Sequence, residues 1–438
     1  MKIVYVGDNR NRDNFGCRAT STALSQIISQ ENTIVGRIYG HYTNGDVDNV
    51  FYYKGLSENL YKKITQKHRW WYIRKFLILI FHFWGRKERN GLPKYDFIEY
   101  NWDKSITNLK KCIPANPVLA ECDLDQYDYD ALVVNGEGSF IFSNRPWREA
   151  MVESMLMYWA KKQGKKVFFM NAMFSKGNDD ELNMETVDAV KSIFESIDYV
   201  GVREKWSLEM GKKLFPKANI HLYPDALFSW YGYINDGFNI VDGKYFIGFS
   251  GATDETFNDY RFDKPYICLS GSSSRNTQKD LRYTIEQYTK LINKLKTISG
   301  YNVYIVIPCS GDDFLIEVSK TTNTKLIPVD TPILAAGKVL ANASVYVTGR
   351  YHPAILASLG GTPCVFMGSN SHKNISIQEV LEYDNPHEYF EVPDENDIES
   401  IVNECKEILS IGSKVREKIK LRSSQLSEIS ITMRNEIK

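Results

Sequence analysis

The sequence predicts an α/β protein with two domains, each built on a largely parallel sheet. Short apolar, β-branched runs alternate with helical segments along most of the 438 residues. A polar, Gly-containing stretch at residues 229–244 separates two such series and is predicted to be a linker. Polar residues follow directly after several apolar runs, and open parallel sheets bind ligands at the carboxyl ends of their strands.

Composition excludes several classes of protein. Lys+Arg and Asp+Glu both total 54, so the net charge is zero and a nucleic-acid partner is not indicated. The seven cysteines contain no C-x-x-C pair, which argues against a zinc site or disulfide scaffold and for a reducing compartment. The first residues enter a strand directly, without the pattern of a signal peptide, so we expect a cytoplasmic protein.

The first unit is a strand at 2–7, a polar loop, and a helix from about Ala19 to Ser29. The loop lacks the G-x-G-x-x-G pattern, so a dinucleotide is not indicated. Arg18, at the start of the helix, is a candidate ligand for an anion. Arg10 and Arg12 are either further anion ligands or solvated surface charges.

An insertion at about 41–120 interrupts the alternating pattern of the N-terminal domain, residues 1–228. Between Tyr61 and Arg89 it carries tryptophans and basic flanks around a short apolar run, which is far below the roughly 20 residues that span a bilayer. This composition matches a helix lying in the membrane interface, at the inner face of the plasma membrane. The alternative is a helix that packs on the protein's own core or on a second subunit.

Three more strand ends of the N-terminal domain carry candidate residues. The strand at 131–135 ends in a Gly-rich turn that contains Glu137, a candidate acid or base that is alternatively structural. The strand at 199–202 ends at Arg203, and the strand at 220–224 ends at Asp225. We expect these side chains to face one crevice.

The C-terminal domain, residues 245–395, supplies a cationic group of residues, and helices at 396–438 close the chain. A hydroxyl-rich loop with Ser272 and Arg275 is either a phosphate cradle or a flexible surface loop. Two later strand ends provide Arg350, His352, Asn370, Ser371, His372 and Lys373. Such a pocket suits a ligand with phosphate or carboxylate groups.

An ordered set of motifs resembles the polysaccharide pyruvyl transferase family over about 1–40 and 125–375. The motifs are Val134-Asn135-Gly136-Glu137-Gly138-Ser139, Val202-Arg203-Glu204-Lys205-Trp206-Ser207, Pro224-Asp225, Gly349-Arg350-Tyr351-His352, Gly361-Thr362-Pro363 and Ser371-His372-Lys373. In the first loop, Asn14-Phe15-Gly16 matches the family's Asn-x-Gly, and Asn14 is a candidate substrate-binding residue. Cys17-Arg18 stands where many members carry acidic residues.

The resemblance implies a GT-B-like fold, with two Rossmann-like domains facing across a cleft. It also implies transfer of pyruvate from phosphoenolpyruvate onto two hydroxyls of a sugar, forming a cyclic ketal. Arg350 and His352 match the family's Arg-x-His pair, which is expected to hold the donor's anionic end.

The chemistry of this reaction suggests roles for the candidate residues. We expect Arg350, Arg203 and Lys373 to bind phosphoenolpyruvate, and His352 to assist phosphate departure. Asp225 or Glu137 is the expected base or electrostatic stabiliser.

No metal or other cofactor is expected, and the expected partners are phosphoenolpyruvate and a glycan, which is lipid-linked if the insertion binds membrane. An oligomer remains open. Two alternatives stay open as well: a GT-B glycosyltransferase that uses a sugar nucleotide, and a non-catalytic subunit of a polysaccharide assembly complex.

Overall fold

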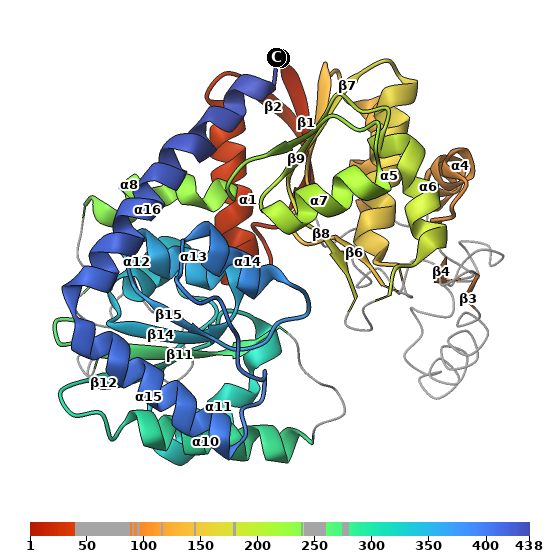
Figure 1. The fold of residues 1–438 in the computed structure, drawn as a ribbon. Coiled ribbons are helices and arrows are strands. Elements are labelled where there is room, and N and C mark those ends of the chain that lie inside the picture. The colour runs from red at the N-terminus through yellow and green to blue at the C-terminus, as the bar shows by residue number, and fades with distance from the viewer. Residues whose placement is uncertain are drawn as a thin grey trace.

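The structure is a computed structural model, and Figure 1 shows its two α/β domains one above the other. It describes residues 1–39, 88–89, 92–93, 97–114, 117–143, 146–177, 181–237, 240, 260–273 and 280–438. The predicted strand at 245–249, Arg275, and the segment at 61–89 up to residue 87 lie outside the described residues. The last two residues of that segment form β3 (Glu88–Arg89), which pairs antiparallel with β4 (Leu92–Pro93).

The N-terminal domain is organised around a six-stranded parallel sheet in the order β10-β9-β7-β5-β1-β2. Its strands are β1 (Lys2–Asp8), β2 (Thr33–Tyr39), β5 (Ala131–Asn135), β7 (Lys166–Ala172), β9 (Tyr199–Val202) and β10 (Ile220–Leu222). The chain proceeds in opposite directions across the sheet from β1 and from β5, so the point between these strands is a topological switch, where open sheets bind ligands.

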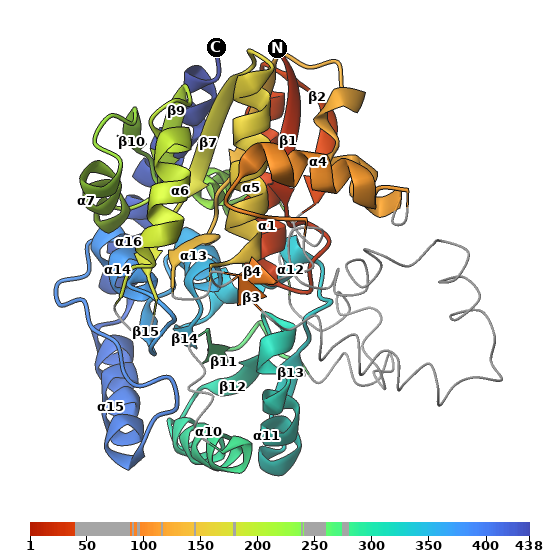
Figure 2. The same ribbon diagram turned by 90° about the vertical axis from the view of Figure 1, so that its right-hand side faces the viewer.

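Alternate residues of the central strands enter two apolar cores on the two faces of this sheet. Tyr5 packs on the face covered by α1 (Phe15–Ser29), and Val4 packs on the opposite face. The helices on that opposite side are α4 (Trp102–Cys112), α5 (Arg148–Lys162) and α6 (Met184–Phe194) (Figure 2). Burial on both faces explains why these strands are continuously apolar.

The C-terminal domain contains a five-stranded parallel sheet in the order β13-β12-β11-β14-β15. Its strands are β11 (Tyr266–Ser272), β12 (Asn302–Val306), β13 (Lys325–Ile327), β14 (Val345–Gly349) and β15 (Cys364–Phe366). Its helices are α10 (Leu281–Leu295), α11 (Phe314–Thr322), α12 (Ile333–Asn342), α13 (Tyr351–Leu359) and α14 (Lys373–Val380). The switch point of this sheet lies between β11 and β14.

Helices from both domains pack between the two sheets. Figure 1 shows α1 of the upper domain against α12 and α13 of the lower one. A single apolar core contains Leu24 of α1 and Trp230 from the N-terminal side, and Leu356 of α13 from the C-terminal domain, so it runs through both domains. A large apolar interface of this kind restrains relative movement of domains.

The C-terminal helices connect the two domains a second time. The helix α15 (Glu395–Ile411) packs on α10, and α16 (Ser413–Ile431) returns to the N-terminal domain, where it packs on η7 (Ala226–Trp230). The Tyr223 hydroxyl donates a hydrogen bond to Glu436, at 2.6 Å. The stretch predicted as a linker contains the helix α8 (Tyr231–Asn235), because the apolar Ile234 and Ile240 pack into the core.

The positions at which two helices begin affect the site. The helix α1 begins at Phe15 instead of near Ala19, because the Asn14 side chain accepts a hydrogen bond from the Cys17 backbone N–H (3.2 Å) and caps it. The helix α13 begins before Pro353, which places His352 in its first turn.

No helix in the described part of the chain combines the length and the apolar character needed to cross a membrane.

Candidate active site between the two sheets

Turns from both domains meet at one cavity of about 280 Å³. Lining residues from Asn9 to Arg203 form its N-terminal wall, and those from Ser273 to Lys373 form its C-terminal wall. Seven of the residues predicted for the site line it: Asn14, Glu137, Arg203, Arg350, His352, Asn370 and Lys373. Strand ends that are far apart in sequence therefore do converge, as the parallel sheets predict.

Backbone contacts bring α1 close to the C-terminal domain beside this cavity. The Phe15 N–H donates to the Pro308 carbonyl at 2.7 Å, next to a bridge between Asn14 and Cys309. Gly16 then lies against His352, and a Cβ atom at Gly16 would lie 2.7 Å from the imidazole Nδ1. Glycine allows this approach because it has no side chain, so the Asn-x-Gly motif places α1 against His352.

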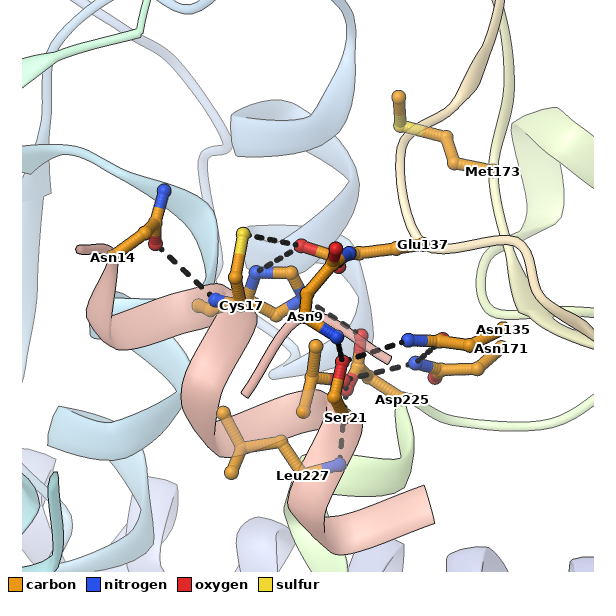
Figure 3. A network of polar contacts seen from close by, with 12 residues as sticks. Asn9, Asn14, Cys17, Ser21, Asn135, Glu137, Asn171, Met173, Asp225 and Leu227 are labelled. Atoms are coloured by element: carbon orange, nitrogen blue, oxygen red, sulfur yellow. Dashed lines mark hydrogen bonds and ion pairs between the residues drawn. The ribbon is translucent and has the colours of Figure 1, made fainter. Parts of the chain in front are cut away.

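Glu137 lies in the turn after β5, with a φ of +30° that non-glycine residues rarely adopt. Its carboxylate accepts hydrogen bonds from Asn9 Nδ2 (2.7 Å) and Cys17 Sγ (3.2 Å), as Figure 3 shows. Burial opposes ionisation of Glu137, but His352 and the Asn9 amide outweigh it, so its pKa lies below the ordinary value. Glu137 is therefore an ionised group of the N-terminal wall that can accept a proton.

Asp225 lies behind the cavity, where it binds two of the lining residues. Its Oδ2 accepts from Arg203 at 3.0 Å and lies 3.3 Å from His352 Nε2. Burial opposes ionisation of Asp225, but the neighbouring His352 and Arg203 hold its pKa well below the ordinary value. Asp225 is thus a buried anion that orients His352 and Arg203, and it does not line the cavity itself.

A buried network of amides and hydroxyls fixes Asp225 and the turn after β1. Figure 3 shows Asn135 and Asn171 side by side, joined by a hydrogen bond of 3.2 Å. Asn135 donates to Ser21 at 3.1 Å, and Asn171 donates to Thr20 at 2.9 Å. Thr20 in turn donates to Asp225 at 2.9 Å. Thr20 and Ser21 lie three and four residues after Cys17, a lining residue of α1, and support the cavity from behind its lining.

Arg350 is held in place by a carboxylate that the sequence analysis did not single out. Its Nε and one terminal nitrogen donate to the two oxygens of Asp312, at 3.1 and 2.6 Å. Asp312 is fully buried beside Gly271, where a Cβ atom would lie 2.3 Å from the Asp312 Oδ1. This bidentate pair fixes the guanidinium plane of Arg350 at the edge of the cavity.

Lys373, at the start of α14, is a cation in an unfavourable environment. Its ammonium donates to the Asn370 side chain at 2.6 Å, and no described carboxylate lies within ion-pair distance of it. Burial and the nearby Arg350 and Arg203 lower the pKa of Lys373 to about 7. A bound anion would stabilise its charged form, as a negative neighbour does for any buried amine.

Glu149 lies in the N-terminal wall, close to a second glutamate, Glu153, behind the lining; neither is predicted from the sequence. Arg12 donates to Glu149 at 3.1 Å, and both side chains are mostly buried, so Arg12 is not a solvated surface charge. Glu153, beneath them, accepts from Ser139 Oγ at 2.7 Å. Burial and the neighbouring Glu149 raise the pKa of Glu153 well above the ordinary value.

His372 takes part in a contact between the domains outside the cavity. Its ring stacks on Trp206 of α7 (Lys205–Leu214) at 5.5 Å between centroids. Its Nε2 lies 3.1 Å from Glu204, and the Trp206 indole donates to Glu379 at 2.9 Å. His372 therefore joins α14 to the N-terminal domain and does not line the cavity.

Three further predicted residues also lie outside the lining. Their side chains contact protein atoms: Ser371 contacts the Met173 sulfur, Ser272 donates to the Gly368 carbonyl, and Arg18 donates to the Val329 carbonyl. Arg18 also lies over the Phe15 ring, at 5.3 Å. The earlier start of α1 turns Arg18 toward the C-terminal domain and away from the anion site expected for it.

Several residues of the site were not predicted, and some carried a usable signal. Asn9, in the lining, follows β1, and Asp312, which holds Arg350 from behind the lining, follows β12. The rule that selected Arg203 and Arg350 applies to both. Cys17 and Trp147 gave no signal, because their place in the cavity depends on where α1 and α5 begin.

The comparisons with known proteins agree with this architecture. The family model "polysaccharide pyruvyl transferase" matches residues 14–371. None of the curated proteins matches the chain. Among solved structures, the UDP-GlcNAc 2-epimerase from Neisseria meningitidis bound to UDP-GlcNAc has a TM-score of 0.53 at 10% identity, with 99% of each chain covered. That from Methanocaldococcus jannaschii, in complex with UDP-GlcNAc and UDP, has a TM-score of 0.47 at 13% identity, covering 98% of this chain and 99% of its own.

The likeness to the Neisseria enzyme and the two parallel sheets confirm a GT-B-type pair of Rossmann-like domains. The family model extends from the cap of α1 to the loop before α14, and so includes most of the residues that line both walls of the cavity, except Asn9, Arg12 and Lys373. The chain is a transferase that belongs to the polysaccharide pyruvyl transferase family.

Proposed function

We propose that the protein transfers pyruvate from phosphoenolpyruvate onto two hydroxyls of one sugar, forming a cyclic ketal during synthesis of a cell-surface polysaccharide. The observation that supports this most is the division of charge in the cavity. Its C-terminal wall presents Arg350 and Lys373, and its N-terminal wall presents the ionised Glu137. A small dianionic donor and a hydroxyl acceptor need these two kinds of group side by side.

The cations match the donor. Phosphoenolpyruvate carries a phosphate and a carboxylate on one small enol, and guanidinium groups bind such oxyanions in a bidentate manner. Arg350 and Arg203 are fixed by Asp312 and Asp225, so little side-chain freedom is lost when the donor binds. Lys373, with its pKa lowered to about 7, gains its full charge when the donor is present.

The proposed reaction balances without a metal or a further cofactor. One sugar hydroxyl attacks C2 of the enol and gives up its proton, while C3 takes a proton and becomes the methyl group. The C2–O bond to phosphate then breaks, phosphate leaves as hydrogen phosphate, and the second hydroxyl loses its proton as it closes the ketal.

Glu137 is the proposed base or electrostatic stabiliser of the oxocarbenium-like transition state. His352, held by Asp225, is proposed to assist phosphate departure. In this proposal Asp225 acts through His352 and Arg203 and has no contact with the substrate.

The test is incubation with phosphoenolpyruvate and a panel of glycans, followed by assays for released phosphate and for the mass of the pyruvate ketal. We expect phosphate release only when donor and acceptor are both present. Lys373→Met should weaken donor binding, whereas Lys320→Met, an exposed lysine on α11, should not. Phosphate release without ketal formation would contradict the proposal.

A sugar-nucleotide transferase is the second candidate, because the Neisseria structure is bound to UDP-GlcNAc and the same cations could hold a diphosphate. Thermal shifts with phosphoenolpyruvate and with UDP-, GDP- and CMP-sugars separate the two. Stabilisation by a sugar nucleotide alone would favour this second candidate.

A lipid-linked acceptor and contact of residues 61–89 with the inner face of the plasma membrane also belong to the proposal. The intact protein should float with anionic liposomes, and replacement of Trp70 and Trp84 by Ser should reduce flotation. Failure of the intact protein to float would remove this part and leave the catalytic proposal standing.

A further inference from the structure

We propose that Trp147 is the aromatic platform on which the acceptor sugar lies, at the N-terminal wall of the cavity. The inference rests on the proposed function, because it names the residue that binds the glycan in that reaction.

Trp147 differs from the other tryptophans of the described residues. Its side chain lines the cavity and the residue is 38% exposed, whereas Trp102, Trp159 and Trp230 are 7%, 5% and 4% exposed. Trp206 is exposed as well, but it stacks on His372 and its indole donates to Glu379. In the described part of the chain, no aromatic ring stacks on Trp147, so no such ring competes with a ligand at the cavity.

Helix stability does not explain why a tryptophan stands at position 147. It is the N-cap residue of α5, and it makes no side-chain cap hydrogen bond. Ser, Thr, Asp and Asn stabilise a helix at this position, and an apolar side chain does not. A large exposed ring at a helix start therefore indicates a role outside folding, such as contact with a ligand.

The groups around Trp147 fit the two kinds of surface that a pyranose presents. The apolar C–H face of the sugar can pack on the indole ring and on Ile141, which also lines the cavity. Its hydroxyls need donors and acceptors, and the Arg12–Glu149 pair supplies both at 3.1 Å from one another. Glu149 lies two residues after Trp147, in the first turn of α5. A few polar groups beside an aromatic surface are typical of small-molecule sites.

This arrangement separates the acceptor from the donor within one cavity. Trp147, Ile141 and Glu149 belong to the N-terminal wall, together with the proposed base Glu137, whereas Arg350 and Lys373 belong to the C-terminal wall. A neutral sugar on Trp147 would thus present its hydroxyls on the side of the carboxylate, and the cations would remain available for phosphate and carboxylate. The ligand class that follows is a neutral pyranoside with one apolar face.

The experiment is steady-state kinetics of Trp147→Ala and Trp147→Phe with an active acceptor. We expect Trp147→Ala to raise the KM for the acceptor roughly tenfold, as the loss of an aromatic contact predicts. The KM for phosphoenolpyruvate and kcat should stay within about twofold, because a contact equal in ground and transition states changes KM alone. Trp147→Phe should restore the acceptor KM to within about threefold.

Tyr233→Ala is the matched control, since Tyr233 is 55% exposed on α8 and does not line the cavity. It should change neither KM. An acceptor KM unaltered in Trp147→Ala, or an equal rise in both KM values, would overturn the platform.

A binding measurement distinguishes failure of this inference from failure of the proposed function. Saturation-transfer NMR on the intact protein with methyl glycosides of galactose, glucose, mannose and N-acetylmannosamine reports sugar binding whether or not turnover occurs. Signal with the unaltered protein that is lost in Trp147→Ala and kept in Tyr233→Ala supports the platform, even if no ketal forms. No signal with any glycoside at tens of millimolar overturns it.

Discussion

The two walls of the cavity use charge in opposite ways. In the C-terminal wall, Arg350 is fixed by the buried Asp312, and Lys373 is held by the neutral Asn370. The N-terminal wall contains the carboxyls of Glu137 and Glu149, together with Arg12, which pairs with Glu149, and Arg203, which pairs with Asp225. Under the proposed function, the C-terminal wall and Arg203 receive the anionic donor, and the carboxyl of Glu137 accepts protons.

This contrast has a physical origin in the elements that form each wall. The cations of the C-terminal wall start the helices α13 and α14, where the helix dipole disfavours positive charge. Arg350 has the buried Asp312 as a fixed partner, whereas Lys373 has only the neutral Asn370. The carboxyls of the N-terminal wall lie at a tight turn and in the first turn of α5, where backbone N–H groups favour negative charge. A bound anion would offset the positive charges of the C-terminal wall and leave the carboxyls of the N-terminal wall unchanged.

The largest expected effect comes from removing the fixed cation of the C-terminal wall. Arg350→Ala should lower kcat/KM for phosphoenolpyruvate roughly 10³-fold, since a preorganised charged donor to the reacting anion is lost. It should also lower the free energy of unfolding by about 3–5 kcal/mol, because Asp312 is left buried without its charge partner. Urea unfolding and phosphate release measure the two effects.

The double variant Arg350→Met, Asp312→Leu separates the two roles of this pair. It removes both buried charges, so most of the lost stability should return while activity stays low. Recovery of activity in the double variant would show that Arg350 supports the fold and does not bind the donor.

The next largest effect tests the proton-accepting wall. Glu137→Gln should lower kcat roughly 10²-fold and leave the affinity for phosphoenolpyruvate unchanged, because the amide keeps the shape and cannot take a proton. Phosphate release measures kcat, and a thermal-shift titration measures donor affinity. A large loss of donor affinity would show that Glu137 contributes to binding of phosphoenolpyruvate and does not act on proton transfer alone.

The sequence predicts the fold and the positions of the cations, but it does not predict which carboxylates hold them. Apolar runs that end in Arg203 or Arg350 locate the cations, because parallel strands place their carboxyl ends along one edge. The partners of those cations are harder to predict. Asp312 and Asp225 reach them only through the relative position of neighbouring strands and of the two domains, which no local pattern in the sequence specifies.

Helix boundaries explain most of the remaining differences. The sequence predicts that α1 begins near Ala19, yet the cap by Asn14 starts the helix at Phe15. This earlier start brings Cys17 into the cavity and directs Arg18 away from it. A cap of this kind adds only about 1 kcal/mol, so a competing residue pattern can hide it. The place of Trp147 in the cavity could not be predicted for the same reason, because it depends on where α5 begins and Trp147 stands where a capping residue is expected.

A moderate effect is expected from Lys373, the cation of the C-terminal wall that is held by the neutral Asn370. The folded pKa of Lys373, about 7, lies below the unfolded value, so the unfolded chain binds more protons from pH 7 to about 10. Unliganded protein should therefore gain stability as the pH rises through this window. Affinity for phosphoenolpyruvate should fall up to tenfold per pH unit above 7, because the neutral amine must be protonated when the anion binds.

Urea unfolding and calorimetric titration in two buffers of different ionisation enthalpy check both trends. Lys373→Met should abolish the stability gain, and Lys373→Arg should remove the pH dependence of donor affinity. Proton release on donor binding, in place of uptake, would contradict the assignment.

The smallest effect is expected at Arg18, which the structure places between the domains and outside both walls. Arg18→Gln removes the hydrogen bond to the Val329 carbonyl and the contact with the Phe15 ring. Because the side chain is only half buried, the loss of stability should be about 1 kcal/mol, and both KM values should change less than about twofold. A tenfold rise in the KM for phosphoenolpyruvate would return Arg18 to the donor site.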